Sequence, residues 1–81
     1  MNVDYEIRNK VMNALVVCRK EKGISQKELA KSIDSKETTV ASWEQGKSLP
    51  SIDMLYRISK FYGKTIAYMY GEEGTSDDSL I

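Results

Sequence analysis

The stretch of sequence that decides the fold is Ser25-Gln-Lys-Glu-Leu-Ala-Lys-Ser-Ile-Asp-Ser-Lys-Glu-Thr-Thr-Val-Ala-Ser-Trp-Glu-Gln-Gly46. It predicts two short helices joined by a tight turn. Ser25 stands three residues before Glu28, a spacing that predicts a capping box: the Ser25 hydroxyl accepts from the Glu28 N–H, and the Glu28 carboxylate accepts from the Ser25 N–H. Gly46 provides the left-handed residue with which many helices end. Isolated helices below ~12–15 residues are marginal in water, so this stretch must pack against the rest of the chain.

Apolar residues at helical spacing predict the remaining elements. The first helix is expected over residues 3–22, with one apolar stripe formed by Ile7, Val11, Leu15 and Cys18. The two helices of the deciding stretch are expected over residues 26–33 and 36–45. Two more are expected over 52–62 and 66–70, with Ser51 and Thr65 as their N-caps. The predicted core consists of Val11, Leu15, Cys18, Ile24, Leu29, Ile33, Val40, Trp43, Leu49, Leu55, Ile58, Phe61, Ile66 and Met69.

These elements predict an all-α fold, a compact five-helix domain over residues 1–71. The last stretch, residues 72–81, is acidic, polar and contains glycine, and we expect it to form a disordered, flexible tail. All twelve Lys and Arg but only eight of the twelve acids lie in residues 1–70, which therefore carry a net charge of +4. A mildly basic body suits a polyanionic partner, although many protein surfaces carry a similar charge.

Several classes of protein receive no support from the composition. The chain has no histidine, the commonest general base, and no pair of groups at metal-ligand spacing, so we expect no enzyme, metal or cofactor. The single cysteine, Cys18, excludes an intramolecular disulfide and is read as a small buried hydrophobe, which favours a cytoplasmic setting. No apolar run is long enough to span a membrane.

Four segments in order along the chain carry a resemblance to a known family. They are Arg19-Lys-Glu-Lys-Gly-Ile-Ser-Gln-Lys-Glu-Leu-Ala30, Trp43-Glu-Gln-Gly-Lys47, Leu49-Pro-Ser51 and Tyr70-Gly71. Together they resemble the Xre/Cro family of phage-repressor DNA-binding domains, over about residues 7–71. The resemblance implies a lambda-repressor-like helix-turn-helix, in which the third helix enters the major groove of double-stranded DNA, and a homodimer on paired half-sites. Asp34 departs from the family, which usually has glycine at that position of the turn.

The resemblance also implies residue roles. By position, Glu37, Thr38 and Ser42 match the family's base-reading residues, and with Val40 and Trp43 inward these three side chains point outward. Glu37 can accept from cytosine N4, while Thr38 and Ser42 can bond to either base type or contact a thymine methyl group. The alternative is that these residues form a solvated polar face, with Glu37 as an acid that favours the helix N-terminus.

Contacts with the DNA backbone are expected from other side chains. The family uses a Gln at the position of Gln26 for the backbone, and the first turn of a helix favours an anion. The further candidates lie near the two helix ends: Lys27, Lys36, Gln45 and Lys47. Arg19 and Glu44 match a pair that forms an internal ion pair in family members.

The resulting hypothesis is a sequence-specific transcriptional regulator, a repressor that occupies its operator as a dimer. The alternative is an antitoxin-type or anti-repressor module whose main role is to bind a protein partner through its tail, with Leu80 and Ile81 as a possible anchor.

Overall fold

The computed structural model describes residues 3–72, which contain five helices and no strand. The helices are α1 (Val3–Lys22), α2 (Gln26–Ser32), α3 (Glu37–Glu44), α4 (Ile52–Tyr62) and α5 (Ile66–Met69). Each begins and ends within about one residue of its predicted bounds. The prediction of an all-α, five-helix fold is confirmed.

Side-chain caps set the starts of three of these helices. At α2 the capping box forms in both directions: the Glu28 N–H donates to the Ser25 hydroxyl at 3.0 Å, and the Ser25 N–H donates to the Glu28 carboxylate at 2.8 Å. Ser51 and Thr65 accept from backbone N–H groups at the starts of α4 and α5. Each cap satisfies a donor that the helix itself leaves unpaired.

The turn between α2 and α3 contains Asp34 with a φ of 61°, in the left-handed region. The Ser35 N–H donates to the Ala30 carbonyl at 2.7 Å and closes the turn. Among residues 3–72, Asp34 alone adopts a positive φ without being glycine. Aspartate tolerates this conformation better than most residues, so the turn forms without the glycine that the family usually has there.

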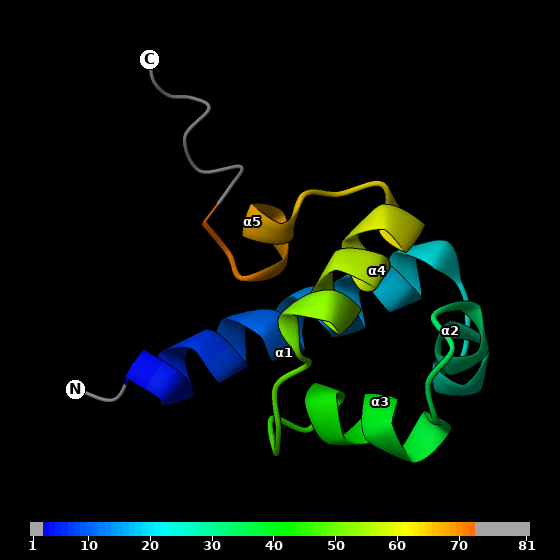
Figure 1. Cartoon of the computed structure of the whole chain (residues 1–81), viewed down its shortest axis with the longest axis horizontal. Helices are drawn as coiled ribbons and strands as arrows, with labels where there is room; N and C mark the ends of the chain where they lie inside the picture. The colour runs from blue at the N-terminus through cyan, green and yellow to red at the C-terminus, as the bar shows by residue number, and fades with distance from the viewer. Residues whose placement is uncertain (1–2, 73–81) are drawn as a thin grey trace.

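The helices pack so that α3 is held between two others. Helices α2 and α3 contact one another, α3 and α5 both contact α1, and α4 contacts α5. In Figure 1, α2 lies at the right, α3 along the lower edge and α5 toward the upper left, and the second half of α1 passes behind α4. Gly46 ends α3 with a φ of 75°, and a Cβ there would lie 3.2 Å from the Met12 sulfur, so glycine also permits the approach of this turn to α1.

The core agrees with the prediction at most positions. Its fully buried apolar residues are Val11, Leu15, Cys18, Leu29, Ala30, Ile33, Val40, Trp43, Leu55, Ile58 and Met69, with Ile24, Phe61 and Ile66 packed around them. One prediction was wrong. Leu49 is 40% exposed, because the neighbouring Pro50 takes the buried position in the loop after α3.

The last described residue is fastened to the body of the domain. The Glu72 N–H donates to the Ala67 carbonyl at 3.0 Å, and the Glu72 carboxylate contacts the Lys10 ammonium at 3.2 Å. Residues 73–81, where a flexible tail was predicted, lie outside the described residues, and the domain end at residue 71 stays a prediction. No helix within residues 3–72 has the length and hydropathy needed to cross a membrane.

Candidate nucleic-acid interface

An ion pair fixes the end of α3 to the end of α1. Arg19 donates from Nε to one oxygen of the Glu44 carboxylate at 2.8 Å and from Nη2 to the other at 3.0 Å. Its third nitrogen, Nη1, donates to the Ile24 carbonyl at 2.9 Å. The Arg19 and Glu44 side chains are 16% and 4% exposed, so the pair is largely shielded from water. A bidentate, shielded pair constrains orientation more than an exposed one does, and it therefore sets the position of α3.

Gln26, at the first position of α2, joins the same network. Its Nε2 donates to the Glu44 carboxylate at 3.0 Å, so three helices meet at one side chain. Burial of Glu44 tends to raise the pKa of its carboxyl group, but hydrogen bonds from Arg19 and Gln26 and the Arg19 charge outweigh burial and lower this pKa. Glu44 is therefore an anion at neutral pH, and it holds the start of α2 against the end of α3.

The outward side of α3 presents the three candidate base-reading residues in different environments. Glu37 and Thr38, in its first turn, are exposed. Ser42 is half-buried, and its hydroxyl shares a hydrogen bond of 2.8 Å with the Ser48 hydroxyl in the loop after α3. Because either oxygen can be the donor, Ser42 keeps the capacity to bond to a further group, while Ser48 limits its rotation.

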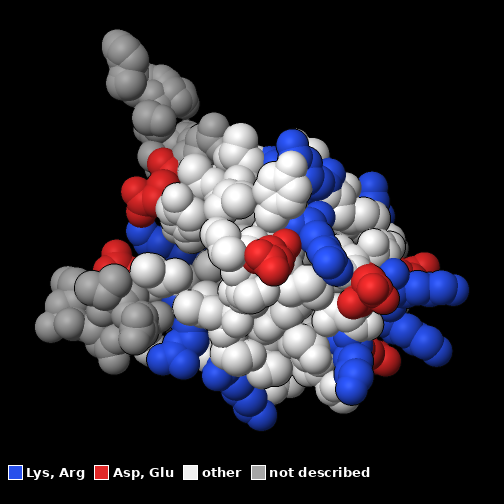
Figure 2. Space-filling view, viewed as in Figure 1, with Lys and Arg blue, Asp and Glu red and all other residues white. Residues whose placement is uncertain are grey.

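The candidate backbone-contacting residues lie in two groups beside α3. Lys27 and Lys36 are exposed and line one hollow between α2 and the start of α3, together with Glu37. Gln45 and Lys47 are exposed at the other end of α3. Figure 2 shows basic side chains projecting along the edge of the molecule that α2 and α3 form. The arrangement gives α3 a polar outer side with cations near both of its ends.

Three contacts of this region were missed from the sequence. They are the bond from Gln26 to Glu44, the bond between Ser42 and Ser48, and the bond from Arg57 Nη1 to the Ile33 carbonyl at 3.2 Å. The Arg57 contact fastens the turn between α2 and α3 to α4. No local pattern signals the bonds of Gln26 and Arg57, because their partners are 18 and 24 residues away in sequence.

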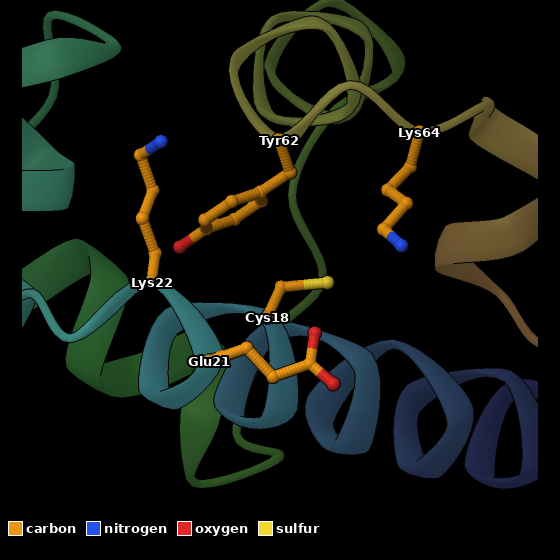
Figure 3. A pocket seen from close by; sticks show the side chains of 5 residues that line it. All are labelled: Cys18, Glu21, Lys22, Tyr62 and Lys64. Atoms are coloured by element: carbon orange, nitrogen blue, oxygen red, sulfur yellow. The ribbon is translucent and has the colours of Figure 1, made fainter.

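A separate pocket lies between the last turn of α1 and the segment after α4 (Figure 3). Cys18, Glu21, Lys22, Tyr62 and Lys64 line it, and its volume is about 230 Å³. Cys18 is 3% exposed, which confirms its interpretation as a buried hydrophobe, and burial raises the pKa of its thiol. Pockets for small molecules measure about 300–1,000 Å³, so this one is small for a ligand. Within residues 3–72, no group of His, Cys, Asp or Glu side chains could hold a metal ion.

Comparison with known proteins agrees with this geometry. The sequence model of a family described as helix-turn-helix matches residues 17–69, which run from the last turns of α1 through α5. The chain belongs to this family. The resemblance to Xre/Cro-type helix-turn-helix domains is therefore confirmed.

Two curated relatives of this helix-turn-helix chain are named as regulators of transcription. One is the HTH-type transcriptional activator BcrR of Enterococcus faecalis, 38% identical over 68% of this chain and 28% of its own length. The other is the cryptic phage CTXphi transcriptional repressor RstR of Vibrio cholerae, 30% identical over 78% of this chain and 57% of its own length. The chain thus spans 28% of the length of the first relative and 57% of the length of the second. No solved structure matches it significantly.

Proposed function

We propose that this helix-turn-helix domain, residues 1–71, binds double-stranded DNA in the major groove and regulates transcription. The observation that carries the proposal is the fixed position of α3. Arg19 and Gln26 both bond to Glu44, so α1 and α2 hold the end of α3, while Glu37 and Thr38 at its start remain exposed. In helix-turn-helix proteins the N-terminal residues of this helix contact base edges.

Sequence preference would come from Glu37, Thr38 and Ser42. Glu37 can accept a hydrogen bond from cytosine N4, and the hydroxyls of Thr38 and Ser42 can serve as donor or acceptor to either base type. The bond between Ser42 and Ser48 supports this role for Ser42, because a hydroxyl with restricted rotation loses less entropy on binding.

Affinity would come from contacts with phosphates. Lys27 and Lys36 near one end of α3, and Gln45 and Lys47 near the other, can reach the two sides of a groove. Gln26 uses one N–H of its amide for Glu44, and its second N–H can donate to a phosphate. These contacts position the domain and make binding weaker as the salt concentration rises.

We further propose that the chain acts as a dimeric repressor that occupies an operator and excludes RNA polymerase. A single module buries about 600–1,000 Å² on DNA, so two half-sites are the expected route to high affinity. The name of the phage repressor, whose length the chain covers to 57%, favours repression. The other relative, BcrR, is named as an activator.

Selection of bound sites from a random duplex library tests this proposal. The wild-type chain should enrich a motif with two-fold symmetry. In a second selection, Ser42→Ala should shift the preferred base at one position of each half-site. Lys64→Ala, a charge change in the segment after α4, should recover the wild-type motif. Failure to enrich any motif, or equal motifs for wild type and Ser42→Ala, would contradict sequence reading by α3.

A further inference from the structure

The outer side of α4 is exposed along its whole length and carries large apolar residues. Five positions share this side: Ile52, Asp53, Tyr56, Arg57 and Lys60. Ile52 is 66% exposed and Tyr56 is 52% exposed, and Leu49 in the preceding loop is 40% exposed. Spaced four residues apart on a helix, Ile52 and Tyr56 lie next to one another. Ile52 and Tyr56 therefore form one apolar patch, which we call the α4 patch, and Leu49 is exposed in the loop before it.

The monomer does not need these apolar residues for its own packing. The opposite side of α4 already supplies Leu55, Ile58 and Ser59 to the buried interior. Ile52 is the most exposed large apolar residue among those described, and exposed apolar patches of this kind often mark interaction sites. In Figure 2, an acidic and a basic side chain interrupt the otherwise uncharged surface over α4.

Charge along this side of α4 changes sign from one end to the other. Asp53 lies in the first turn, Arg57 follows one turn later, and Lys60 lies in the last turn. Asp53 and Lys60 are ~10 Å apart along the axis, given the 1.5 Å rise per residue. A second copy of α4 placed antiparallel would bring its acidic end to the basic end of the first, and its basic end to the acidic end. The surface is thus complementary to itself, the condition for an interface across a two-fold axis.

We propose that α4 forms the homodimer interface, packing antiparallel against α4 of a second copy of this chain. Tyr56 lies beside the two-fold axis, Asp53 faces the partner's Lys60, and Ile52 lies at each end of the contact. The inference rests on the proposed function, in which the chain acts as a dimer. What it adds is the surface through which two copies associate. In Figure 1, α4 lies in front and α3 runs along the lower edge, so a contact on the outer side of α4 leaves α3 open to DNA.

The size of the patch predicts a weak dimer. A standard interface buries about 800 Å² per partner, and the outer side of one helix of 11 residues provides only part of that area. We therefore expect monomer and dimer to exchange in solution, and two adjacent half-sites on DNA to favour the dimer through effective concentration.

Sedimentation equilibrium of the full chain without DNA tests the interface, at protein concentrations up to about 1 mM. Wild type should show concentration-dependent dimers, and Tyr56→Glu should weaken association at least ~10-fold, as removal of a central interface residue does. Val17→Glu is the matched control, because Val17 is 47% exposed on α1 and the change adds the same charge. A monomeric wild type, or a loss of association equal in both variants, would overturn the proposal.

A charge exchange tests the antiparallel arrangement. Asp53→Lys and Lys60→Glu should each weaken the dimer by placing like charges opposite one another, and the double variant should restore it. Circular dichroism confirms that each variant is folded. A double variant weaker than both single variants would overturn the arrangement. Binding of the same samples to a random duplex is measured separately, so that loss of DNA binding contradicts the proposed function and loss of association contradicts the interface.

Discussion

The Arg19 guanidinium and the Glu44 carboxylate form a bidentate ion pair, 2.8 and 3.0 Å long, that joins the last turn of α1 to the end of α3. Because α3 has only eight residues, its orientation depends on contacts of this kind more than on its own stability. The pair therefore links the stability of the domain to the position of the residues proposed to read DNA.

Removal of Arg19 should destabilise the domain strongly. Arg19→Ala leaves the Glu44 carboxylate buried without its cation, and such a loss costs about 3–5 kcal/mol. We expect the lower end of this range, because Arg19 retains 16% exposure. Urea denaturation followed by circular dichroism measures the free energy of unfolding. Glu72→Gln breaks the exposed pair between Glu72 and Lys10 and should leave that free energy unchanged within error. Equal effects of both variants would contradict the structural role of the Arg19–Glu44 pair.

Stability should fall in acid because of Glu44. Its pKa is lower in the folded chain than the ordinary value of 4.5, so folding favours its anionic form. The resulting stabilisation is complete above about pH 4.5 and is lost as the pH falls through the lowered pKa. At pH values below 4.5, we expect the urea concentration at the unfolding midpoint to decrease. The decrease should be smaller in Glu44→Gln, whose side chain does not titrate. A pH dependence of the same size in Glu44→Gln would assign the effect to other carboxylates.

The Tyr62 hydroxyl should contribute no stability. Its oxygen is buried and has no hydrogen-bond partner among the described residues, and burial raises the pKa of Tyr62 to about 12. An unpaired buried polar group costs about 1–3 kcal/mol, so Tyr62→Phe should leave the free energy of unfolding unchanged or raise it by up to that amount. Tyr56→Phe, on the exposed side of α4, is the control. A clear loss of stability in Tyr62→Phe alone would reveal a bonded hydroxyl.

The left-handed turn at Asp34 should tolerate glycine and reject a β-branched residue. A left-handed conformation costs L-residues about 1–2 kcal/mol, and valine cannot offset it as aspartate does. Asp34→Val should therefore lower the free energy of unfolding by about that amount. Asp34→Gly should be close to neutral, since the relief of strain is balanced by the greater entropy of the unfolded chain. The two variants are compared by thermal unfolding, and a larger loss for glycine would be inconsistent with the turn geometry.

Local signals made most of the fold predictable. Ser25 with Glu28, and the caps Ser51 and Thr65, each specify a helix start within four residues of sequence, and these caps are present in the structure. Glycine at residues 23, 46 and 63 marks the end of a helix in the same way. Such signals depend on the backbone within one turn, so the sequence alone reveals them.

Contacts between distant residues could not be predicted in the same way. The bond from Gln26 to Glu44 depends on how α2 crosses α3, which no short pattern contains. Leu49 was placed in the core by its type, yet the loop turns Pro50 inward and leaves Leu49 exposed. The roles of Glu37, Thr38 and Ser42 follow from the family resemblance and from their outward positions, and they stay predictions until DNA binding is measured.

Fluorescence anisotropy of a labelled random duplex, titrated with the chain at several salt concentrations, tests the central claim most directly. We expect binding at low salt that weakens linearly with log[salt], and a Lys36→Ala variant whose slope is smaller by about one. Lys64→Ala, distant from α3, should behave as wild type. Undetectable binding at low salt, or a Lys36→Ala variant that binds as tightly as wild type with the same slope, would contradict DNA binding through α3.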